Sequence, residues 1–374
     1  MMILLSTFLF ERLYKLFAPM LYFMKFISET FLYYEVKPVQ RTDRSPTMKD
    51  VAREAGVALG TVSNVYNGAP VSPEYRRRVE EAARRLGYSV NSYARGLRAD
   101  RTNTIAVILP TLQNMFFSDL ANAICRELSK RNLRMLLSVT EYDSQAEAAC
   151  IRMLRQSKVD GIIGLTYSTE NHDVEGMPYV SIDRIISPSV PCVSSDNYGG
   201  GMLAARRLLD LGCRKLLFLR IGSSVSGETD KRGGGFAAEC AMRGADFTLR
   251  TFNDEDGIPS LLTWLDSHVK DGKLEYDGIF CSTDALLNQV AEHLRRQGIR
   301  IPEEVQMIGY DGIRRFFHGE YTCSTIVQPV RQMAETCVEI LANSEQTRPS
   351  ALLCLPVTYA PGGTTKEQVP SDGE

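Results

Sequence analysis

Two short helical patterns joined by a very brief connection are the feature that most constrains this chain. Thr47 can cap the first helix, and Asp50, three residues later, lies at the positive end of the helix dipole. Gly56 stands where a helix usually ends in a left-handed turn, so a second helix must begin within about 3–4 residues. A third pattern runs from Ser72-Pro73 to Gly87 with apolar residues at helical spacing. Together these patterns predict a compact three-helix unit that contains a helix-turn-helix.

The second helix has one apolar face and one face that is free to contact another molecule. Val62, Val65 and Tyr66 supply the apolar face, and Asn67-Gly68 ends the helix. The free face is of the kind that reaches base edges in the major groove of DNA. Its residues, with the one at its end, are Leu59, Gly60, Thr61, Ser63, Asn64 and Asn67.

Basic charge is concentrated in this unit. Residues 47–101 contain ten Lys and Arg against six Asp and Glu, whereas the whole chain has a net charge of −2 and residues 102–374 have one of −8. Because Arg76-Arg77-Arg78 is followed by Glu80-Glu81, charge alone is also consistent with a solvated helix face. Combined with the helix pattern, a basic unit beside an acidic body predicts contact with DNA phosphates.

Apolar strands alternate with amphipathic helices from Asn103 onward, which is typical of a parallel sheet covered on both faces. About 270 residues is too many for one small core, so residues 103–360 are expected to form an α/β body of two doubly wound parallel-sheet subdomains. The expected strands lie at residues 105–109, 134–138, 161–165, 179–183, 215–219, 247–249, 278–282 and 306–311.

From about Thr47 to Tyr359 the chain resembles the lactose and galactose repressor (LacI/GalR) family of transcriptional regulators. The resemblance implies a small all-α helix-turn-helix headpiece at residues 47–89 and a body of the periplasmic-binding-protein-like type I fold. It also implies a hinge helix and linker at residues 90–102, in which Leu97 wedges into the minor groove at the operator centre. The alternative is that Leu97 is an ordinary linker residue. Further DNA contacts implied by the family are Tyr88, Asn91 and Ala94, together with Thr47 at the start of the headpiece.

Several positions differ from the residues usual in that family. Ala58 stands where a serine is usual, Asn64 where an arginine is usual, and Val90 where a proline is frequent. Leu59 and Gly60 offer no side-chain hydrogen bond to a base. Asn64 is suited to adenine, whereas arginine favours guanine. The operator sequence of the family is therefore not carried over to this chain.

Polar residues follow several of the expected strands, where parallel sheets bind their ligands. These residues are Asp183-Arg184, Asp196-Asn197, Asp284 and Asp311. The resemblance implies that Arg232, in an R-x-x-G-F pattern, contacts an effector in the cleft between the subdomains, as do the aspartates at 183 and 284. It also implies that Phe116 and Phe117, which follow Asn114, flank the ligand. Arginine donors, carboxylate acceptors and an aromatic platform suit a polyhydroxylated ligand such as a sugar.

Some of these positions have a second interpretation. Asp196 and Asp311 are also placed to cap the element that follows, and Phe116 and Phe117 are equally typical of a core. Gly199-Gly200-Gly201 and Gly233-Gly234-Gly235 lack the spacing of dinucleotide-binding and phosphate-binding loops, so no nucleotide site is expected there.

The two ends of the chain lie outside the family pattern. Residues 1–46 contain aromatic clusters interrupted by charges, with neither an apolar run of ~20 residues nor the layout of a signal peptide. An over-extended gene start and a disordered arm are both consistent with this segment. Residues 361–374 are expected to be a mobile tail. Nine cysteines without a C-x-x-C motif and four scattered histidines predict neither disulfides nor a metal site, which fits the cytoplasm.

These observations predict a homodimeric, effector-gated DNA-binding regulator, a repressor rather than an activator, acting on a near-palindromic operator. It is expected to be cytoplasmic and nucleoid-associated, with a sugar or sugar derivative as its effector and with no membrane partner, metal or cofactor. The alternative is a sugar-binding protein or sensor without a role in transcription, which would need an export signal and no basic headpiece. An enzyme is not expected, because no nucleophile–base pair or cofactor loop is visible.

Overall fold

A computed structural model describes residues 46–88, 102–166, 174, 176–222, 227–253, 257–315, 319–343 and 352–366. The chain divides into two compact units, Met1–Asn91 and Ser92–Glu374, and each is described by itself. The expected arm at residues 1–45 and the expected hinge residues Asn91, Ala94 and Leu97 lie outside the described residues. In the described part, none of the helices has the length and apolarity that crossing a membrane requires.

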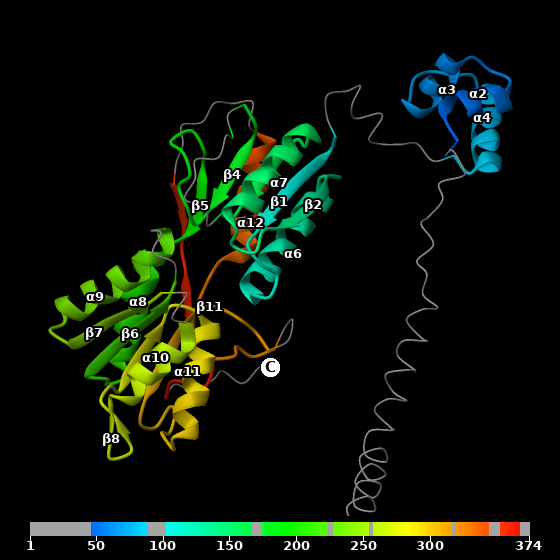
Figure 1. Cartoon of the computed structure of the whole chain (residues 1–374). Coiled ribbons are helices and arrows are strands. Elements are labelled where there is room, and N and C mark those ends of the chain that lie inside the picture. The colour runs from blue at the N-terminus through cyan, green and yellow to red at the C-terminus, as the bar shows by residue number, and fades with distance from the viewer. Residues whose placement is uncertain are drawn as a thin grey trace, which may run out of the picture. The chain divides into compact units, whose positions relative to one another are not determined.

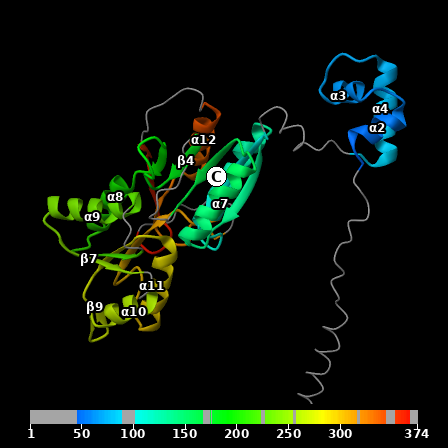
Figure 2. The same ribbon diagram turned by 45° about the horizontal axis from the view of Figure 1, so that its top comes forward.

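The described residues of the first unit, 46–88, form three helices (Figures 1 and 2). They are α2 (Met48–Ala55), α3 (Leu59–Tyr66) and α4 (Pro73–Leu86). Thr47 and Asp50 form a capping box at the start of α2, because the Thr47 backbone N–H donates to Asp50 Oδ2 at 2.9 Å and the Asp50 N–H donates to Thr47 Oγ1 at 3.4 Å. Gly56 at φ 63° and Gly87 at φ 62° end α2 and α4 in the left-handed conformation. The predicted helix-turn-helix is confirmed.

A small apolar core holds these three helices together. Val51, Val62 and Val79, one from each helix, are all 0% exposed. Arg78 of α4 adds a polar connection, since its Nη2 donates to the carbonyl oxygen of Ala55 at 2.7 Å. This bond satisfies one of the carbonyl groups that a helix end leaves without a partner.

In the described part of the second unit, the strands form two six-stranded sheets and one two-stranded hairpin (Figure 1). The first has the order β13-β5-β4-β3-β1-β2 and is wholly parallel. Its strands are β1 (Thr104–Leu109), β2 (Arg134–Val139), β3 (Gly161–Gly164), β4 (Tyr179–Ile182), β5 (Cys192–Ser195) and β13 (Leu352–Leu355). Helices α6 (Met115–Lys130) and α12 (Val330–Ala342) cover one face, and α7 (Ser144–Gln156) covers the other. Alternate residues of β1 contact the two layers: Val107 meets the first pair of helices and Ile108 meets α7.

The second sheet has the order β14-β12-β11-β10-β6-β7, parallel except that its edge strand β14 pairs antiparallel with β12. Its strands are β6 (Lys215–Ile221), β7 (Asp246–Phe252), β10 (Gly278–Cys281), β11 (Gln306–Asp311), β12 (Thr325–Val327) and β14 (Thr358–Ala360). Helices α8 (Asn197–Asp210) and α9 (Lys231–Met242) cover one face, whereas α10 (Gly257–Asp266) and α11 (Asp284–Arg296) cover the other. A 3-10 turn, η1 (Glu228–Asp230), and a hairpin of β8 (Val269–Lys270) and β9 (Lys273–Leu274) complete it.

The chain passes between the two subdomains three times. It leaves β5 for α8, leaves β12 for α12, and continues from β13 of the first sheet into β14 of the second, as the long red segment of Figure 1 shows. The prediction of two doubly wound subdomains is confirmed, and each expected strand has a counterpart in one of the two sheets. The strands that the sequence analysis missed are β5, β12, β13, β14 and the β8–β9 hairpin. These strands have two to four residues each, too few to display a periodic pattern.

The expected mobile tail begins too early in the sequence analysis. Residues 361–366 belong to the second subdomain, where Thr364 and Thr365 are 4% and 2% exposed. Thr364 Oγ1 accepts from the Ser324 N–H at 2.9 Å and donates to the Met307 carbonyl at 2.7 Å. Polar composition suggested a tail, but the Thr364 hydroxyl is hydrogen-bonded to backbone groups of the second subdomain.

One glycine of each run lies where two helices pack together. Gly201 of α8 lies so close to α9 that an added Cβ would stand 2.0 Å from the Arg232 carbonyl oxygen. Gly235 of α9 makes the reciprocal contact, with 1.9 Å from its added Cβ to the Tyr198 carbonyl oxygen. The backbones of α8 and α9 approach this closely only because neither position carries a side chain. This approach brings Arg232 of α9 next to Asn197 of α8.

Candidate functional site

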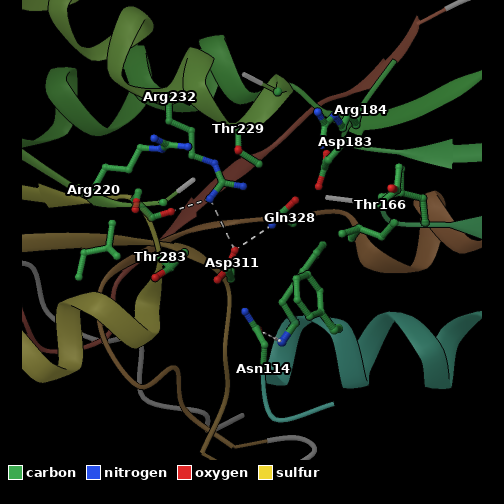
Figure 3. A pocket seen from close by; sticks show the side chains of 18 of the residues that line it. Asn114, Thr166, Asp183, Arg184, Arg220, Thr229, Arg232, Thr283, Asp311 and Gln328 are labelled. Carbon is green, nitrogen blue, oxygen red and sulfur yellow. Dashed lines mark hydrogen bonds and ion pairs between the residues drawn. The ribbon is translucent and has the colours of Figure 1, made fainter. Parts of the chain in front are cut away.

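A cavity of about 620 Å³ lies at the carboxyl ends of the strands of both sheets. Figure 3 shows side chains from the two subdomains converging on it. Its lining residues are Asn114, Phe116, Phe117, Tyr142, Leu165, Thr166, Ile182, Asp183, Arg184, Arg220, Ile221, Gly222, Gly227, Thr229, Arg232, Ser282, Thr283, Asp311 and Gln328. The volume is in the range of small-molecule sites, and the location is where open α/β sheets bind ligands.

Arg232 is the most strongly positioned side chain of the cavity, and it is 4% exposed. Its Nε donates to Asn197 Oδ1 at 2.7 Å, and its Nη1 donates to the Ser282 carbonyl at 2.5 Å. The guanidinium carbon lies 3.6 Å from the centroid of the Tyr310 ring, a cation–π contact in a desolvated place. Its Nη1 also lies 3.9 Å from Asp311 Oδ1, and a dashed line in Figure 3 marks this ion pair. Because hydrogen bonds fix both Nε and Nη1, the guanidinium group has one orientation before a ligand binds, and a ligand meets a preorganised donor.

Two buried aspartates provide acceptors in the same cavity. Asp183 Oδ1 accepts from Ser194 Oγ at 2.6 Å, and Asp311 Oδ1 accepts from Gln328 Nε2 at 2.8 Å. Burial raises the pKa of both carboxyl groups above the ordinary range, although Arg232 acts in the opposite direction on each. Their backbones have positive φ, 56° at Asp183 and 128° at Asp311, which is a costly conformation for a non-glycine residue. Asp311 was interpreted from sequence either as a ligand-site residue or as a cap of the following element. The structure places it in the cavity wall.

Asp284, which was expected to face a ligand, is not among the residues that line the cavity. The residue is 0% exposed. Its Oδ1 accepts from Thr325 Oγ1 at 2.6 Å, and its Oδ2 accepts from the N–H groups of Gly312 and Ile313 at 3.0 and 2.8 Å. The Asp284 carboxylate thus stabilises the turn that follows β11. Asp311, the last residue of β11 and part of the cavity wall, directly precedes that turn. Position after a strand was correct, but the direction of the side chain was not readable from sequence.

Asp196, in contrast, has the capping role that was its alternative interpretation. Its Oδ1 accepts from the Gly199 N–H at 2.8 Å at the start of α8. Asn114 likewise caps α6, with Oδ1 accepting from the Phe116 N–H at 2.9 Å, and it also lines the cavity. Phe116 and Phe117 are each 5% exposed and serve both interpretations, because they belong to the core of the first subdomain and to the cavity wall.

The sequence analysis missed several residues of the cavity, most of them polar. They are Tyr142, Thr166, Arg220, Gly227, Thr229, Thr283 and Gln328. Arg220 directly follows the expected strand at residues 215–219 and was overlooked, although β6 extends one residue beyond it. Gln328 stands at a crossing between the subdomains, so it does not look like a strand-end ligand in the sequence. The available signal was weak: Thr166 and Thr283 follow β3 and β10 by two residues.

The expected DNA-contact residues of the first unit differ in exposure. Leu59, Gly60, Asn64 and Asn67 are exposed, and Leu59 is 42% exposed despite its apolar side chain. Within the described part of the first unit, these residues leave one side of α3 open to solvent, as a base-reading helix requires.

The remaining expected contacts are partly engaged within the first unit. Thr61, Ser63 and Tyr88 are half-buried. Ser63 Oγ accepts from Asn67 Nδ2 at 3.2 Å, and the Tyr88 ring lies 5.8 Å from that of Tyr66. Thr47 uses its hydroxyl in the capping box, donating to Asp50 Oδ2 at 2.7 Å.

No group of three or more histidine, cysteine, aspartate or glutamate side chains suited to a metal ion occurs among the described residues.

Two family models match the chain. Residues 47–91 match the family described as bacterial regulatory proteins, lacI family, and residues 102–350 match the family described as periplasmic binding proteins and sugar binding domain of LacI family. The chain is also 31% identical over 305 residues to the sucrose operon repressor of Lactococcus lactis subsp. lactis, a match that covers 79% of this chain and 92% of that one.

Solved structures agree with this match. A periplasmic binding protein/LacI transcriptional regulator from Alkaliphilus metalliredigens QYMF, complexed with D-xylulofuranose, is 27% identical with a TM-score of 0.61, covering 71% of this chain and 100% of that chain. The lac repressor dimer bound to operator and the anti-inducer ONPF has a TM-score of 0.73 at 21% identity, over 86% of this chain and 99% of that one, and shows likeness of fold.

Proposed function

The chain belongs to the LacI family of bacterial regulatory proteins, and we propose that it represses transcription under the control of a small polyhydroxylated effector. It is a DNA-binding transcriptional regulator with an effector-binding body. Members of the family act as regulators rather than as enzymes, in agreement with the expectation for this chain.

The observation that carries the proposal is the cavity at the carboxyl ends of both sheets, with Arg232 fixed in its wall. A sugar hydroxyl is both donor and acceptor, so it matches a guanidinium beside the carboxyl oxygens of Asp183 and Asp311. Phe116 and Phe117 add the apolar surface that the C–H face of a sugar ring contacts. The relatives named for sucrose and solved with D-xylulofuranose support a carbohydrate.

Control of DNA binding follows from the position of the cavity between two subdomains that are connected by three chain crossings. A ligand that contacts both sheets favours whichever relative arrangement of the subdomains fits it best. Its effect on DNA affinity equals its differential affinity for the DNA-competent and incompetent states, commonly ~1–3 kcal/mol.

We further propose a homodimer on a near-palindromic operator, in the cytoplasm and associated with the nucleoid. One three-helix unit offers a single short reading helix, and a two-fold pair doubles the base contacts at one site. The predicted minor-groove wedge at Leu97, with the hinge contacts of Asn91 and Ala94, remains part of this proposal. Tyr88, Thr47 and the exposed face of α3 are proposed to contact the major groove and its phosphates.

DNA binding is tested with purified full-length protein and a genome-wide map of bound sites, followed by gel shifts on the best site. Affinity is expected to fall steeply between about 50 and 200 mM salt, because phosphate contacts release counterions. Asn64→Ala should lower affinity for the best site by roughly tenfold without changing binding to random DNA. Asn253→Ala is the matched control, because Asn253 is exposed in the second unit.

Equal loss with both variants would contradict the role of α3, and salt-independent binding would contradict phosphate contact. A protein that binds sugars but no DNA fragment would instead be the solute-binding protein or sensor of the alternative interpretation.

A further inference from the structure

Arginine is unusually abundant in the cavity, where three of the lining residues are Arg184, Arg220 and Arg232. The acidic residues in the lining are Asp183 and Asp311. A neutral sugar needs donors and acceptors in balance, so the question is how many of these guanidinium groups are already neutralised by the protein.

Arg220 is neutralised. Its Nη2 lies 2.5 Å from Asp230 Oδ1, and the arginine side chain is 16% exposed. Arg232 is only partly satisfied, because Nε and Nη1 have hydrogen-bond acceptors while its Nη2 has none among the described residues. Arg184 follows β4, is half-buried, and has neither an ion pair nor a side-chain hydrogen bond within the described part of the chain.

Among the described residues, a carboxyl group lies near Arg232, since its Nη1 is 3.9 Å from Asp311 Oδ1, but none forms an ion pair with Arg184. Glu228 is 7% exposed and is paired with Lys231 Nζ at 2.6 Å. Burial raises the pKa of Asp183 and of Asp311, which favours their uncharged forms. Within the described part of the cavity, Arg184 thus has no carboxylate partner, and Arg232 keeps its Nη2 available to a ligand.

We propose that the effector carries an oxyanion, a phosphate or a carboxylate, on its polyhydroxylated body, and that Arg184 and Arg232 bind this group. This inference rests on the proposed function and names the chemical class of its ligand. The planar guanidinium fork matches the geometry of both oxyanions.

The surroundings of the two arginines complete an anion subsite. Figure 3 draws Arg184, Thr229 and Arg232 along one side of the cavity and Asn114 on the opposite side. Thr229 offers a hydroxyl donor in the cavity lining. The anion lies on this side, and the sugar ring extends toward the aromatic wall of Phe116 and Phe117.

Matched pairs of compounds test the charge directly. Calorimetry on the full-length protein compares D-fructose 6-phosphate with D-fructose and D-glucuronate with D-glucose, and inorganic phosphate alone serves as a further probe. At least one charged member is expected to bind about tenfold or more tighter than its neutral partner, equivalent to about 1.4 kcal/mol. Its affinity should also fall as salt rises. The phosphate and carboxylate arms distinguish the two kinds of oxyanion.

Variants then locate the subsite. Arg184→Gln should reduce the affinity for the charged compound to about that of its neutral partner, and Arg184→Lys should restore part of the difference. Arg152→Gln removes the same charge from an exposed position of α7 outside the cavity and should leave both affinities unchanged. Arg184 makes no contact that the fold needs among the described residues, so melting temperatures should match.

The proposal is overturned if the members of each pair bind equally, if only neutral sugars bind, if no anionic compound binds, or if Arg184→Gln keeps the preference for charge. If the members of each pair bind equally, or if only neutral sugars bind, the proposed function still holds provided that a neutral sugar releases the protein from DNA. Absence of DNA binding would refute the proposed function whatever the ligand results show.

Discussion

The close approach of α8 and α9 can be tested by adding one methyl group at Gly235. An alanine Cβ there would stand 1.9 Å from the Tyr198 carbonyl oxygen and 3.1 Å from the Met202 nitrogen. Both atoms belong to the backbone of α8, so no flexible side chain can move aside. The helices must separate, and the bond between Arg232 Nε and Asn197 Oδ1 must lengthen with them.

Overpacking of a well-packed contact costs about 1–3 kcal/mol or more, and the backbone clash places Gly235→Ala at the upper end. The gain in helix propensity from glycine to alanine returns about 1 kcal/mol. The free energy of unfolding should therefore fall by about 2 kcal/mol or more. Gly234→Ala is the matched control on the same helix, because its Cβ would meet only the Tyr198 ring at 3.8 Å. That variant should be neutral or more stable by up to about 1 kcal/mol.

Urea unfolding measured by fluorescence provides the assay. Trp264 is the single tryptophan of the chain and lies in α10 of the same subdomain, next to Phe252 and Tyr276. The midpoint for Gly235→Ala should fall by roughly 1 M urea, given a typical slope of about 2 kcal/mol per M. Effector affinity should fall with it, since Arg232 is displaced. Equal midpoints for Gly235→Ala and Gly234→Ala would refute the argument from backbone contact.

Three further predictions concern the two units. Thr47→Ala removes the capping box of α2 and should destabilise the first unit by about 1 kcal/mol, seen as faster amide hydrogen exchange in α2; unchanged exchange would show that the cap is dispensable. Asp284→Ala leaves the buried N–H groups of Gly312 and Ile313 without their acceptor and should lower the unfolding free energy by about 2 kcal/mol or more; a loss of effector affinity at full stability would return Asp284 to the ligand site. Asp311→Asn tests the raised pKa of that carboxyl group. Because ionisation of Asp311 is disfavoured in the folded state, wild type and variant should have equal stability below the ordinary aspartate pKa of about 3.9, and the variant should become the more stable one as pH rises from there; stability curves that stay parallel from pH 4 to 8 would contradict it.

The three-helix unit is the part of the molecule that could be predicted most completely. Its capping box, its left-handed glycines and its apolar spacing are local, and each acts within a few residues of the chain. The longer strands were predictable for a similar reason, since four or more consecutive apolar residues have few other uses in a soluble α/β protein. Short strands such as β12 and β14 exist because they pair with neighbouring strands, β12 with β11 and β14 with β12.

The order of residues along the chain was enough to place two sheets, a helix-turn-helix and an arginine at a helix start. It could not reveal which strand-end carboxyl groups point into the cavity, because side-chain direction depends on neighbours that are distant in sequence. Asp284 shows this most clearly: Thr325, 41 residues away, turns its carboxylate into the fold, whereas Asp311 faces the cavity. The glycine runs and Arg220 acquire their roles only when α8, α9 and β6 lie together, since close packing and ion pairing are properties of assembled elements.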